Sequence, residues 1–413
     1  MGEPTYRFLH AADLHLDSPL RGLAGYEQAS VEVLRSATRR AFLRLVDHAL
    51  ERAVAFVVIA GDLYDGEWKE ANTGHFFLQQ VQRLGQRGVR VYVLHGNHDF
   101  QSALVRQLGG RLPENLSVFP SDTPATFEVP EVPVVLHGQS YPRRDVGDDL
   151  SRCYPPARPG RLNVGVLHTA ADDTEHLPYA PCTVSGLASH GYGYWALGHV
   201  HQGRVLSRAP WIVFPGNLQG RHARETGPKG CVEVECRGEA VVEVTDVVLD
   251  VVRWHRLEVD LSGATTDEAV TDRFLDVIAP LVEENSLRHH AIRVRLSGAT
   301  PMHGSLAARG AELRAQLSGH VAGRFPGVWL EKVLVETRPA DASAAPPSEL
   351  LALLARLAAS EGPLVAAELQ DLDDRLKPLA RTFGDGEAAI GDLASSLPQR
   401  ALALLAARLG VAQ

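Results

Sequence analysis

Residues 7–15 read Arg7-Phe8-Leu9-His10-Ala11-Ala12-Asp13-Leu14-His15, a short apolar run that ends in an aspartate and a histidine two positions apart. The apolar part is typical of a buried β-strand. A carboxylate and an imidazole therefore follow directly at the carboxyl end of that strand. A single pair of this kind is more often an ordinary turn, so its meaning depends on whether the pattern recurs.

The pattern recurs four more times in the first half of the chain, each time after a run that also predicts a buried strand. The four further blocks are Gly61-Asp62-Leu63-Tyr64-Asp65, Gly96-Asn97-His98-Asp99, Leu167-His168-Thr169 and Gly198-His199-Val200-His201. In a mostly parallel sheet, the carboxyl ends of the strands open onto one crevice. Side chains that lie far apart in sequence are therefore expected to meet in one place.

The side chains of these blocks offer imidazole nitrogens, carboxylate oxygens and one amide oxygen. This mixture suits Mn, Fe or Zn better than Ca or Mg. Two cations about 3.5–4 Å apart would neutralise a phosphodiester and turn a bridging water into hydroxide near neutral pH. A carboxylate can bridge two metals, and Asp62 is the candidate bridge. The blocks therefore predict a two-metal phosphoesterase site.

The five blocks resemble the signature of the calcineurin-like metallophosphoesterases. Within that group, the opening Phe8–Leu20 resembles the SbcD-type DNA repair exonucleases, in particular the YhaO branch. The stretches 196–201, 214–217 and 221–230 strengthen this resemblance. It covers residues 6–250 strongly and the following unit only by architecture.

The resemblance implies a role for each matching residue. One metal would be held by Asp13, His15 and His201, and the second by Asn97, His168 and His199, with Asp62 bridging. His98 would not bind a metal: the resemblance implies that it faces the scissile phosphate, with Asp99 orienting its imidazole. A carboxylate in that position would fix the tautomer of the imidazole and raise its basicity.

The resemblance also implies an activity, a metal and partners. We expect a Mn-dependent DNA nuclease of DNA repair, a 3′-to-5′ exonuclease with endonuclease activity on single strands. Its relatives work with a coiled-coil ATPase of the SbcC type (YhaN in this branch), often as a homodimer of the nuclease. Two alternatives stay open from the residues: a small-molecule phosphodiesterase or phosphatase, and a non-catalytic scaffold for such an ATPase.

Length and alternation predict the architecture. A chain of 413 residues is too long for one core. Up to residue 250 strands alternate with helices and then with hairpins, which favours an α/β fold: a metallophosphoesterase sandwich of two sheets flanked by helices. Residues 251–338 follow a β-α-β-α-β order, with its second helix at 306–321, and predict a small α/β capping domain. Residues 339–348 are expected to be a linker, and 349–413 a helical C-terminal tail that is a candidate docking segment for the ATPase.

Charge and hydropathy limit the remaining possibilities. The formal net charge of -9 argues mildly against indiscriminate nucleic-acid binding, although binding depends on the local field. The first residues contain no basic region or apolar core of a signal peptide, and no stretch is apolar enough to span a membrane. We therefore expect a cytoplasmic protein.

Overall fold

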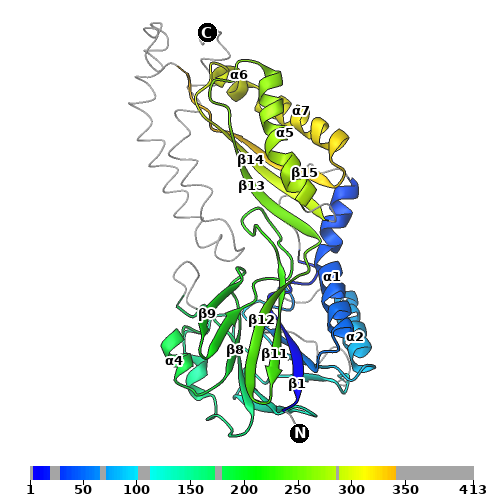
Figure 1. The fold of residues 1–413 in the computed structure, drawn as a ribbon, viewed down its shortest axis with the longest axis vertical. Helices are drawn as coiled ribbons and strands as arrows, with labels where there is room; N and C mark the ends of the chain where they lie inside the picture. Colours follow the sequence, from blue (N-terminus) through cyan, green and yellow to red (C-terminus); the bar gives the residue numbers. More distant parts are fainter. Residues whose placement is uncertain are drawn as a thin grey trace. The chain divides into compact units, whose positions relative to one another are not determined.

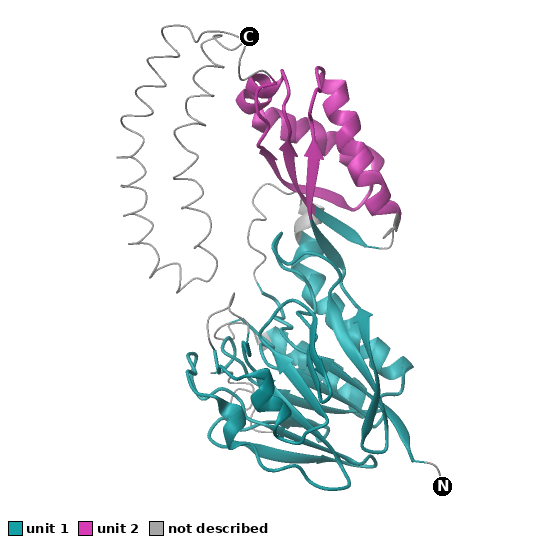
Figure 2. Ribbon diagram, turned by 60° about the vertical axis from the view of Figure 1, so that its left-hand side comes forward, with its two compact units in different colours: residues 1–255, 287–291 teal, residues 256–286, 292–413 magenta. Residues whose placement is uncertain are grey.

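The structure is a computed structural model that describes residues 3–18, 28–65, 71–100, 112–172, 179–284 and 288–340. The chain divides into two compact units, residues 1–255 with 287–291 and residues 256–286 with 292–413 (Figure 2). The expected linker beyond residue 340 and the expected helical tail at 349–413 lie outside the described residues.

The first unit contains two sheets that are each six-stranded in the described residues. The first sheet has the order β12-β11-β1-β2-β3-β4, with β1 Thr5–Ala11, β2 Phe56–Ala60, β3 Arg90–Leu94, β4 Leu116–Val118, β11 Gly230–Arg237 and β12 Ala240–Val248. The second has the order β5-β6-β7-β8-β10-β9, with β5 Ala125–Val129, β6 Val134–Gly138, β7 Leu162–His168, β8 Tyr194–Gly198, β9 Arg204–Arg208 and β10 Trp211–Phe214. The expected two-sheet α/β fold is confirmed.

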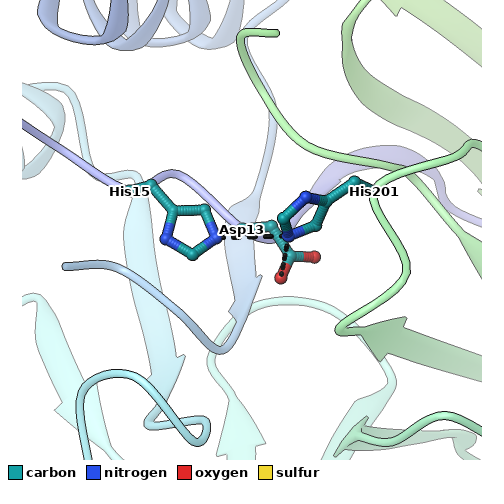
Figure 3. Close-up of side chains that lie close together, drawn as sticks. All are labelled: Asp13, His15 and His201. Carbon is teal, nitrogen blue, oxygen red and sulfur yellow. Dashed lines mark hydrogen bonds and ion pairs between the residues drawn. The ribbon is translucent and has the colours of Figure 1, made fainter. Parts of the chain in front are cut away.

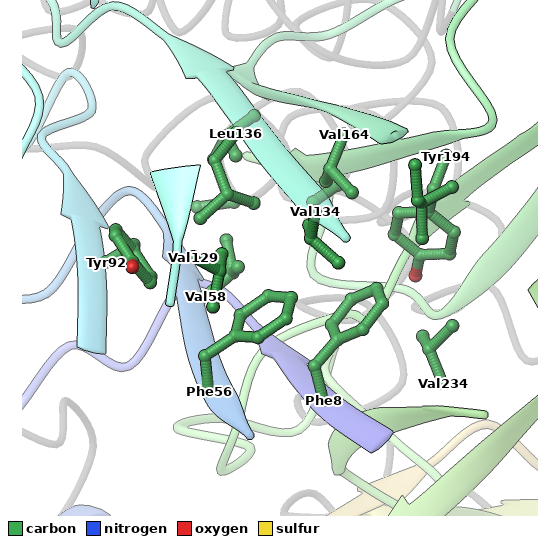
Figure 4. Close-up of a cluster of buried hydrophobic side chains, with 14 of the residues drawn as sticks. Phe8, Phe56, Val58, Tyr92, Val129, Val134, Leu136, Val164, Tyr194 and Val234 are labelled. Atoms are coloured by element: carbon green, nitrogen blue, oxygen red, sulfur yellow. The ribbon is translucent and has the colours of Figure 1, made fainter. Parts of the chain in front are cut away.

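One apolar core lies between the two sheets (Figure 4). Phe8 of β1 stacks on Phe56 of β2 with ring centroids 4.7 Å apart. The edge of Tyr194, from β8 of the other sheet, meets Phe8 at 5.4 Å. Each fully buried aromatic side chain of this kind stabilises the fold by roughly 1.5–3 kcal/mol. Successive side chains of a strand point to opposite faces of the sheet, so every second residue of these strands faces the outer helices.

Helices α1 (Gln28–Glu51) and α2 (Ala71–Gly85) lie side by side along the first sheet (Figure 1). The rings of Phe42 and Phe77 stack between them with centroids 5.5 Å apart. The second sheet is flanked by the short helix α4 (Val184–Ala188) and the 3-10 turn η1 (Leu150–Cys153). There Tyr154 stacks on Trp195 at 5.9 Å.

The strands that bear the predicted blocks run in the same direction. In the first sheet, β1, β2 and β3 are parallel neighbours. In the second, β7 and β8 are parallel neighbours. The carboxyl ends of these strands therefore carry Asp13, Asp62, Asn97, His168 and His199 at one edge of the sandwich.

The second unit has a three-stranded sheet of order β13-β14-β15, with β13 Val252–Asp260, β14 His289–Ser297 and β15 Val328–Val335. Its core includes Phe274 of α5 (Asp267–Glu284), which packs with Ile292 of the sheet. The helix that the sequence predicts at 306–321 is present but interrupted at Arg309. The chain forms α6 (His303–Ala308) and α7 (Gly310–Arg324), because Arg309 leaves the helical conformation (φ -114°, ψ 30°) beside Gly310, a poor helix former.

The four cysteines are all free thiols; Cys153 is exposed and the other three are buried. Across the described ranges, none of the helices combines the length and the apolar character that crossing a membrane requires.

Candidate metal centre

The loops that follow β1, β2 and β8 have unusual backbone conformations at the predicted residues. Asp13, Asp62 and His199 all have positive φ angles, of 52°, 54° and 101°. Such angles cost about 1–3 kcal/mol each for a residue with a side chain, and they concentrate at functional sites. Two hydrogen bonds tie the first two loops together, from Asp13 N to Gly61 O and from His15 N to Asp62 O, each 3.0 Å long.

The first group of side chains comprises Asp13, His15 and His201 (Figure 3). The Nε2 atoms of His15 and His201 lie 3.3 Å apart. Asp13 Oδ1 is buried and lies 3.6 Å from His201 Nε2, too far for a hydrogen bond. Ligand atoms that share one ion at about 2.1 Å stand roughly 3.0–3.4 Å apart, so the separation of the two histidine nitrogens fits a metal and that of Asp13 Oδ1 is slightly wider.

In His15 and His201, a hydrogen bond at Nδ1 fixes the tautomer of the imidazole. His15 Nδ1 lies 2.7 Å from Asp65 Oδ1, and His201 Nδ1 lies 2.6 Å from Glu225 Oε1. A carboxylate accepts hydrogen bonds, so both Nδ1 atoms must donate. In the neutral rings the two facing Nε2 atoms then carry lone pairs. A cation between them removes the repulsion, and a carboxylate behind each histidine is the usual support of a metal-binding imidazole.

The second group comprises Asp62, His168 and His199, whose potential ligand atoms all lie within 4.8 Å of one another. His168 Nδ1 donates to the carbonyl oxygen of Ala60 at 2.9 Å, so in the neutral ring its Nε2 carries a lone pair. That lone pair faces Asn97 Oδ1 at 3.0 Å and Asp62 Oδ2 at 3.4 Å. Three electron-rich atoms thus converge on one point, an arrangement that a cation would stabilise.

Asp62 is a member of the second group and lies next to the first. Its Oδ2 atom lies 3.4 Å from His168 Nε2 and 3.9 Å from His15 Nε2. Its Oδ1 accepts a hydrogen bond from the backbone N–H of His98 at 3.0 Å. The structure therefore brings together all seven residues that the sequence marks as metal ligands, with Asp62 between the two groups.

The charges of the site favour cations. Burial opposes a charge on His168, yet Asp62 and Asp13 raise the pKa of its imidazole to about 9. Burial and the neighbouring His168 lower the pKa of His199 to about 3, so His199 is a neutral imidazole, the form that binds metals. The buried carboxylates thus attract positive charge that a metal ion can supply in place of a proton.

The expected role of Asp99 in orienting the His98 imidazole is wrong. Asp99 accepts hydrogen bonds from the backbone N–H groups of Leu63 at 2.9 Å and Gly96 at 2.6 Å, so it holds the loop. His98 Nδ1 instead lies 3.0 Å from Asp65 Oδ1. Neighbouring side chains of a turn diverge, and that of Asp99 bends back onto the preceding residues. The signal for Asp65 is a second aspartate three positions after Asp62.

Arg221 and Glu225 form a support that the sequence does not predict. Arg221 Nη1 donates to Asp65 Oδ2 at 2.9 Å, and its Nη2 lies 3.4 Å from Glu225 Oε1. Glu225 in turn holds His201 and accepts from Asn217 Nδ2 at 3.0 Å. The signal in the sequence is limited to the resemblance of the 221–230 stretch. Two ion pairs of Arg221 therefore join Glu225, which supports the metal-site residue His201, to Asp65, the partner of His98.

Replacing Asp65 with asparagine is expected to lower kcat roughly 10- to 100-fold, because the amide no longer stabilises a charged His98 imidazole. Asp99→Asn is the matched variant: it is expected to lower the unfolding free energy by about 1–3 kcal/mol, since Asp99 accepts two backbone hydrogen bonds. The check compares hydrolysis of bis-p-nitrophenyl phosphate with urea denaturation for both variants. A larger kcat loss in Asp99→Asn than in Asp65→Asn would restore the original assignment.

Gly96 lies against the site and leaves no room for a side chain. A Cβ atom there would stand 2.3 Å from Asp62 Oδ1 and 2.7 Å from His168 Nε2. We expect Gly96→Ala to cost about 1–3 kcal/mol of stability and to weaken Mn²⁺ binding at least tenfold, because both side chains must move. Isothermal calorimetry checks this result. Gly147→Ala, at a glycine with open space around it, serves as the control. Equal metal affinity in the two variants would contradict the expectation.

Comparison with known proteins agrees with this geometry. Residues 6–203 match the family model for calcineurin-like phosphoesterases, and residues 254–338 match the middle domain of the metallophosphoesterase YhaO. The chain belongs to the calcineurin-like phosphoesterases, as the resemblance in its sequence implied. It is similar to an uncharacterized metallophosphoesterase, YhaO of Bacillus subtilis, with 32% identity over 304 residues, which cover 71% of this chain and 72% of that protein.

The chain also shows weaker similarity to a DNA repair protein and to a phosphatase of known structure. The DNA double-strand break repair protein Mre11 of Methanopyrus kandleri is 27% identical over 216 residues, which cover 47% of this chain and 44% of that protein. The chain thus spans less than half the length of that relative. A dimetal phosphatase from Danio rerio aligns over 60% of this chain and all of its own, with 17% identity and a TM-score of 0.34.

Proposed function

We propose that this protein is a Mn²⁺-dependent phosphodiesterase that cleaves DNA as a 3′-to-5′ exonuclease with endonuclease activity on single strands. The observation that carries the proposal is the contrast within the site. The side chains of His15 and His168 are 0% exposed, whereas that of His98 is 39% exposed. Buried imidazoles suit metal binding, and an accessible one suits contact with a substrate.

We assign Asp13, His15 and His201 to one ion, Asn97, His168 and His199 to the other, and Asp62 to both. When bound, the two ions supply charge neutralisation of the phosphoryl oxygens and a water of lowered pKa as the nucleophile. Mn²⁺ is proposed from the mixture of nitrogen and oxygen ligands.

The protein's own contribution is centred on His98. Its Nδ1 is held by Asp65, which leaves Nε2 directed away from that carboxylate and able to carry a proton. We assign that proton to the leaving oxygen of the phosphodiester, whose developing charge it stabilises. Asp65 fixes the tautomer, and Arg221 holds Asp65 in place.

DNA as the substrate is supported by the similarity to Mre11, which is named for DNA double-strand break repair. The test is cleavage of end-labelled single- and double-stranded DNA with Mn²⁺, beside bis-p-nitrophenyl phosphate. We expect both to be cleaved, with a product ladder that shows removal from the 3′ end. Cleavage of the small ester alone, even with the ATPase present, would favour a small-molecule phosphodiesterase. Cleavage of neither would favour a scaffold.

For partners, we propose a coiled-coil ATPase of the SbcC type (YhaN in this branch) and a homodimer of this chain. The proposal rests on the resemblance in the sequence. We expect removal of residues 345–413 to spare cleavage of bis-p-nitrophenyl phosphate and to weaken binding of the ATPase in a pull-down. Unchanged binding of the ATPase would remove the docking role from this segment.

A further inference from the structure

A group of arginines surrounds Asp250 in the first unit, outside the metal-binding groups. Arg253 forms a bidentate ion pair with this carboxylate, in which Nε donates to Oδ2 at 2.8 Å and Nη2 donates to Oδ1 at 2.9 Å. Arg288 Nε also donates to Oδ1, at 2.9 Å. Asp250 is completely buried, so both of its oxygens are already occupied by these two guanidinium groups.

Arg44 of α1 adds a third guanidinium group. Its Nη1 donates to the backbone carbonyl oxygens of Asp250 and Leu249 and to no carboxylate among the described residues. Arg40 precedes it by four positions on the same helix, so the two side chains lie on one face. Arg40 is exposed and forms no ion pair within the described part of the chain.

Positive charge is therefore in excess at this place. Two arginines contact the Asp250 carboxylate, Arg44 contacts the backbone beside it, and Arg40 lies one helical turn from Arg44, in a chain whose formal net charge is -9. Burial and the charges of Arg288 and Arg40 lower the pKa of Arg44. Burial and the charges of Arg40 and Arg44 likewise lower the pKa of His289. Like charges brought this close repel each other, and a bound anion relieves that repulsion.

Hydrogen bonds of Lys229 connect this arginine group to the metal centre. Lys229 O accepts hydrogen bonds from Leu249 N at 2.9 Å and Asp250 N at 3.0 Å. The Nζ atom of the same lysine donates to His201 O at 2.6 Å. A single residue thus lies between Asp250 and a histidine of the first metal-binding group. Lys229 is buried, so this link runs through the protein and holds the arginine group near the metal centre.

We propose that Arg40, Arg44 and Arg288 form a docking site for the phosphodiester backbone of a nucleic acid, which they hold while another part of the strand lies at the metal centre. The inference rests on the proposed action on DNA. Guanidinium groups match phosphate oxygens in a bidentate way, which favours a chain of phosphates over a single weak anion. Binding to the backbone would increase affinity without selecting a sequence.

The test is Arg40→Glu, with Arg87→Glu as the matched control. Arg87 is an exposed arginine at the end of α2, before β3 begins, and therefore at the opposite end of the strand from the predicted ligands. Binding of fluorescein-labelled DNA to the full chain is followed by anisotropy in EDTA, so that no cleavage occurs. At about 0.1 M salt we expect affinity to fall roughly 8-fold for each phosphate that the variant no longer neutralises, and the salt dependence to decrease by about one counterion.

Three readouts separate the outcomes. Hydrolysis of bis-p-nitrophenyl phosphate with Mn²⁺ should be the same in Arg40→Glu and in the unmodified chain, which also shows that the variant folds. If the unmodified chain binds and cleaves DNA and Arg40→Glu binds it equally well, the docking site is wrong and the proposed function stands. If Arg40→Glu weakens binding to DNA that the unmodified chain does not cleave, the docking site stands and the nuclease proposal fails.

Two further results would overturn the docking site. One is an equal loss of affinity in Arg87→Glu, which would reflect net charge alone. The other is binding to vesicles that contain phosphatidylserine with none to DNA, which would identify a membrane surface as the ligand. Arg44→Gln provides a second variant in which the charge is removed and not reversed. Its affinity for DNA is expected to fall as that of Arg40→Glu does.

Discussion

Asp62→Asn is expected to lower turnover of bis-p-nitrophenyl phosphate about 10³-fold or more and to reduce bound Mn²⁺ from about two ions per chain to one or fewer. Asp62 Oδ2 lies within 4 Å of an imidazole of each metal-binding group. An amide has the same shape but no charge and only one oxygen. Bound metals supply several kcal/mol of transition-state stabilisation, and each 1.36 kcal/mol is a factor of ten in rate.

Metal content by inductively coupled plasma mass spectrometry, measured beside kcat, checks this expectation. Asp122→Asn is the control, because it makes the same chemical change at an exposed aspartate. Near-normal melting of Asp62→Asn would show that the loss comes from the site and not from unfolding. Two ions per chain together with near-normal turnover would contradict the bridging role.

His98→Ala is expected to lower turnover about 10²- to 10⁴-fold, the range for loss of a positioned acid or base. Metal occupancy should stay near two, because His98 Nδ1 is bound to Asp65 and its side chain is partly exposed. The loss should be smaller for esters with a good leaving group, such as p-nitrophenol, than for DNA. An alkoxide leaving group depends more strongly on a proton donor.

The measurement is kcat on both substrates together with metal content. His320→Ala, at an exposed histidine of α7, is the matched control and should change neither. Loss of a metal ion from His98→Ala would make His98 a ligand. Equal losses on DNA and on the nitrophenyl ester would argue against protonation of the leaving oxygen.

The metal-binding groups were predictable because each predicted block follows or ends a largely apolar, buried strand. The run Phe56–Ala60 is completely buried, and a short apolar run of this kind indicates a buried β-strand. Parallel pairing aligns the strand ends within each sheet, and packing of the two sheets brings Asp62 and His168 together from positions 106 residues apart. The fold of the first unit followed from the same strands.

The partner of His98 was not predictable in the same way. Asp65 and Asp99 are both aspartates in loops, and the choice between them depends on backbone angles that no periodic pattern records. Strands β4, β5 and β6 were also missed, although β6 is fully buried. β4 has three residues, and β5 is an edge strand with mostly half-exposed side chains, so neither shows a clear apolar pattern. The break at Arg309 depends on local dihedral angles in the same way.

The most direct test of the account is a titration of the metal-free chain with Mn²⁺ while cleavage of end-labelled DNA and of bis-p-nitrophenyl phosphate is followed. We expect no activity in EDTA, and activity on both substrates that rises until about two ions are bound per chain and then levels off. Full activity at one ion, or cleavage that continues in EDTA, would contradict the two-metal site that Asp62 is proposed to bridge.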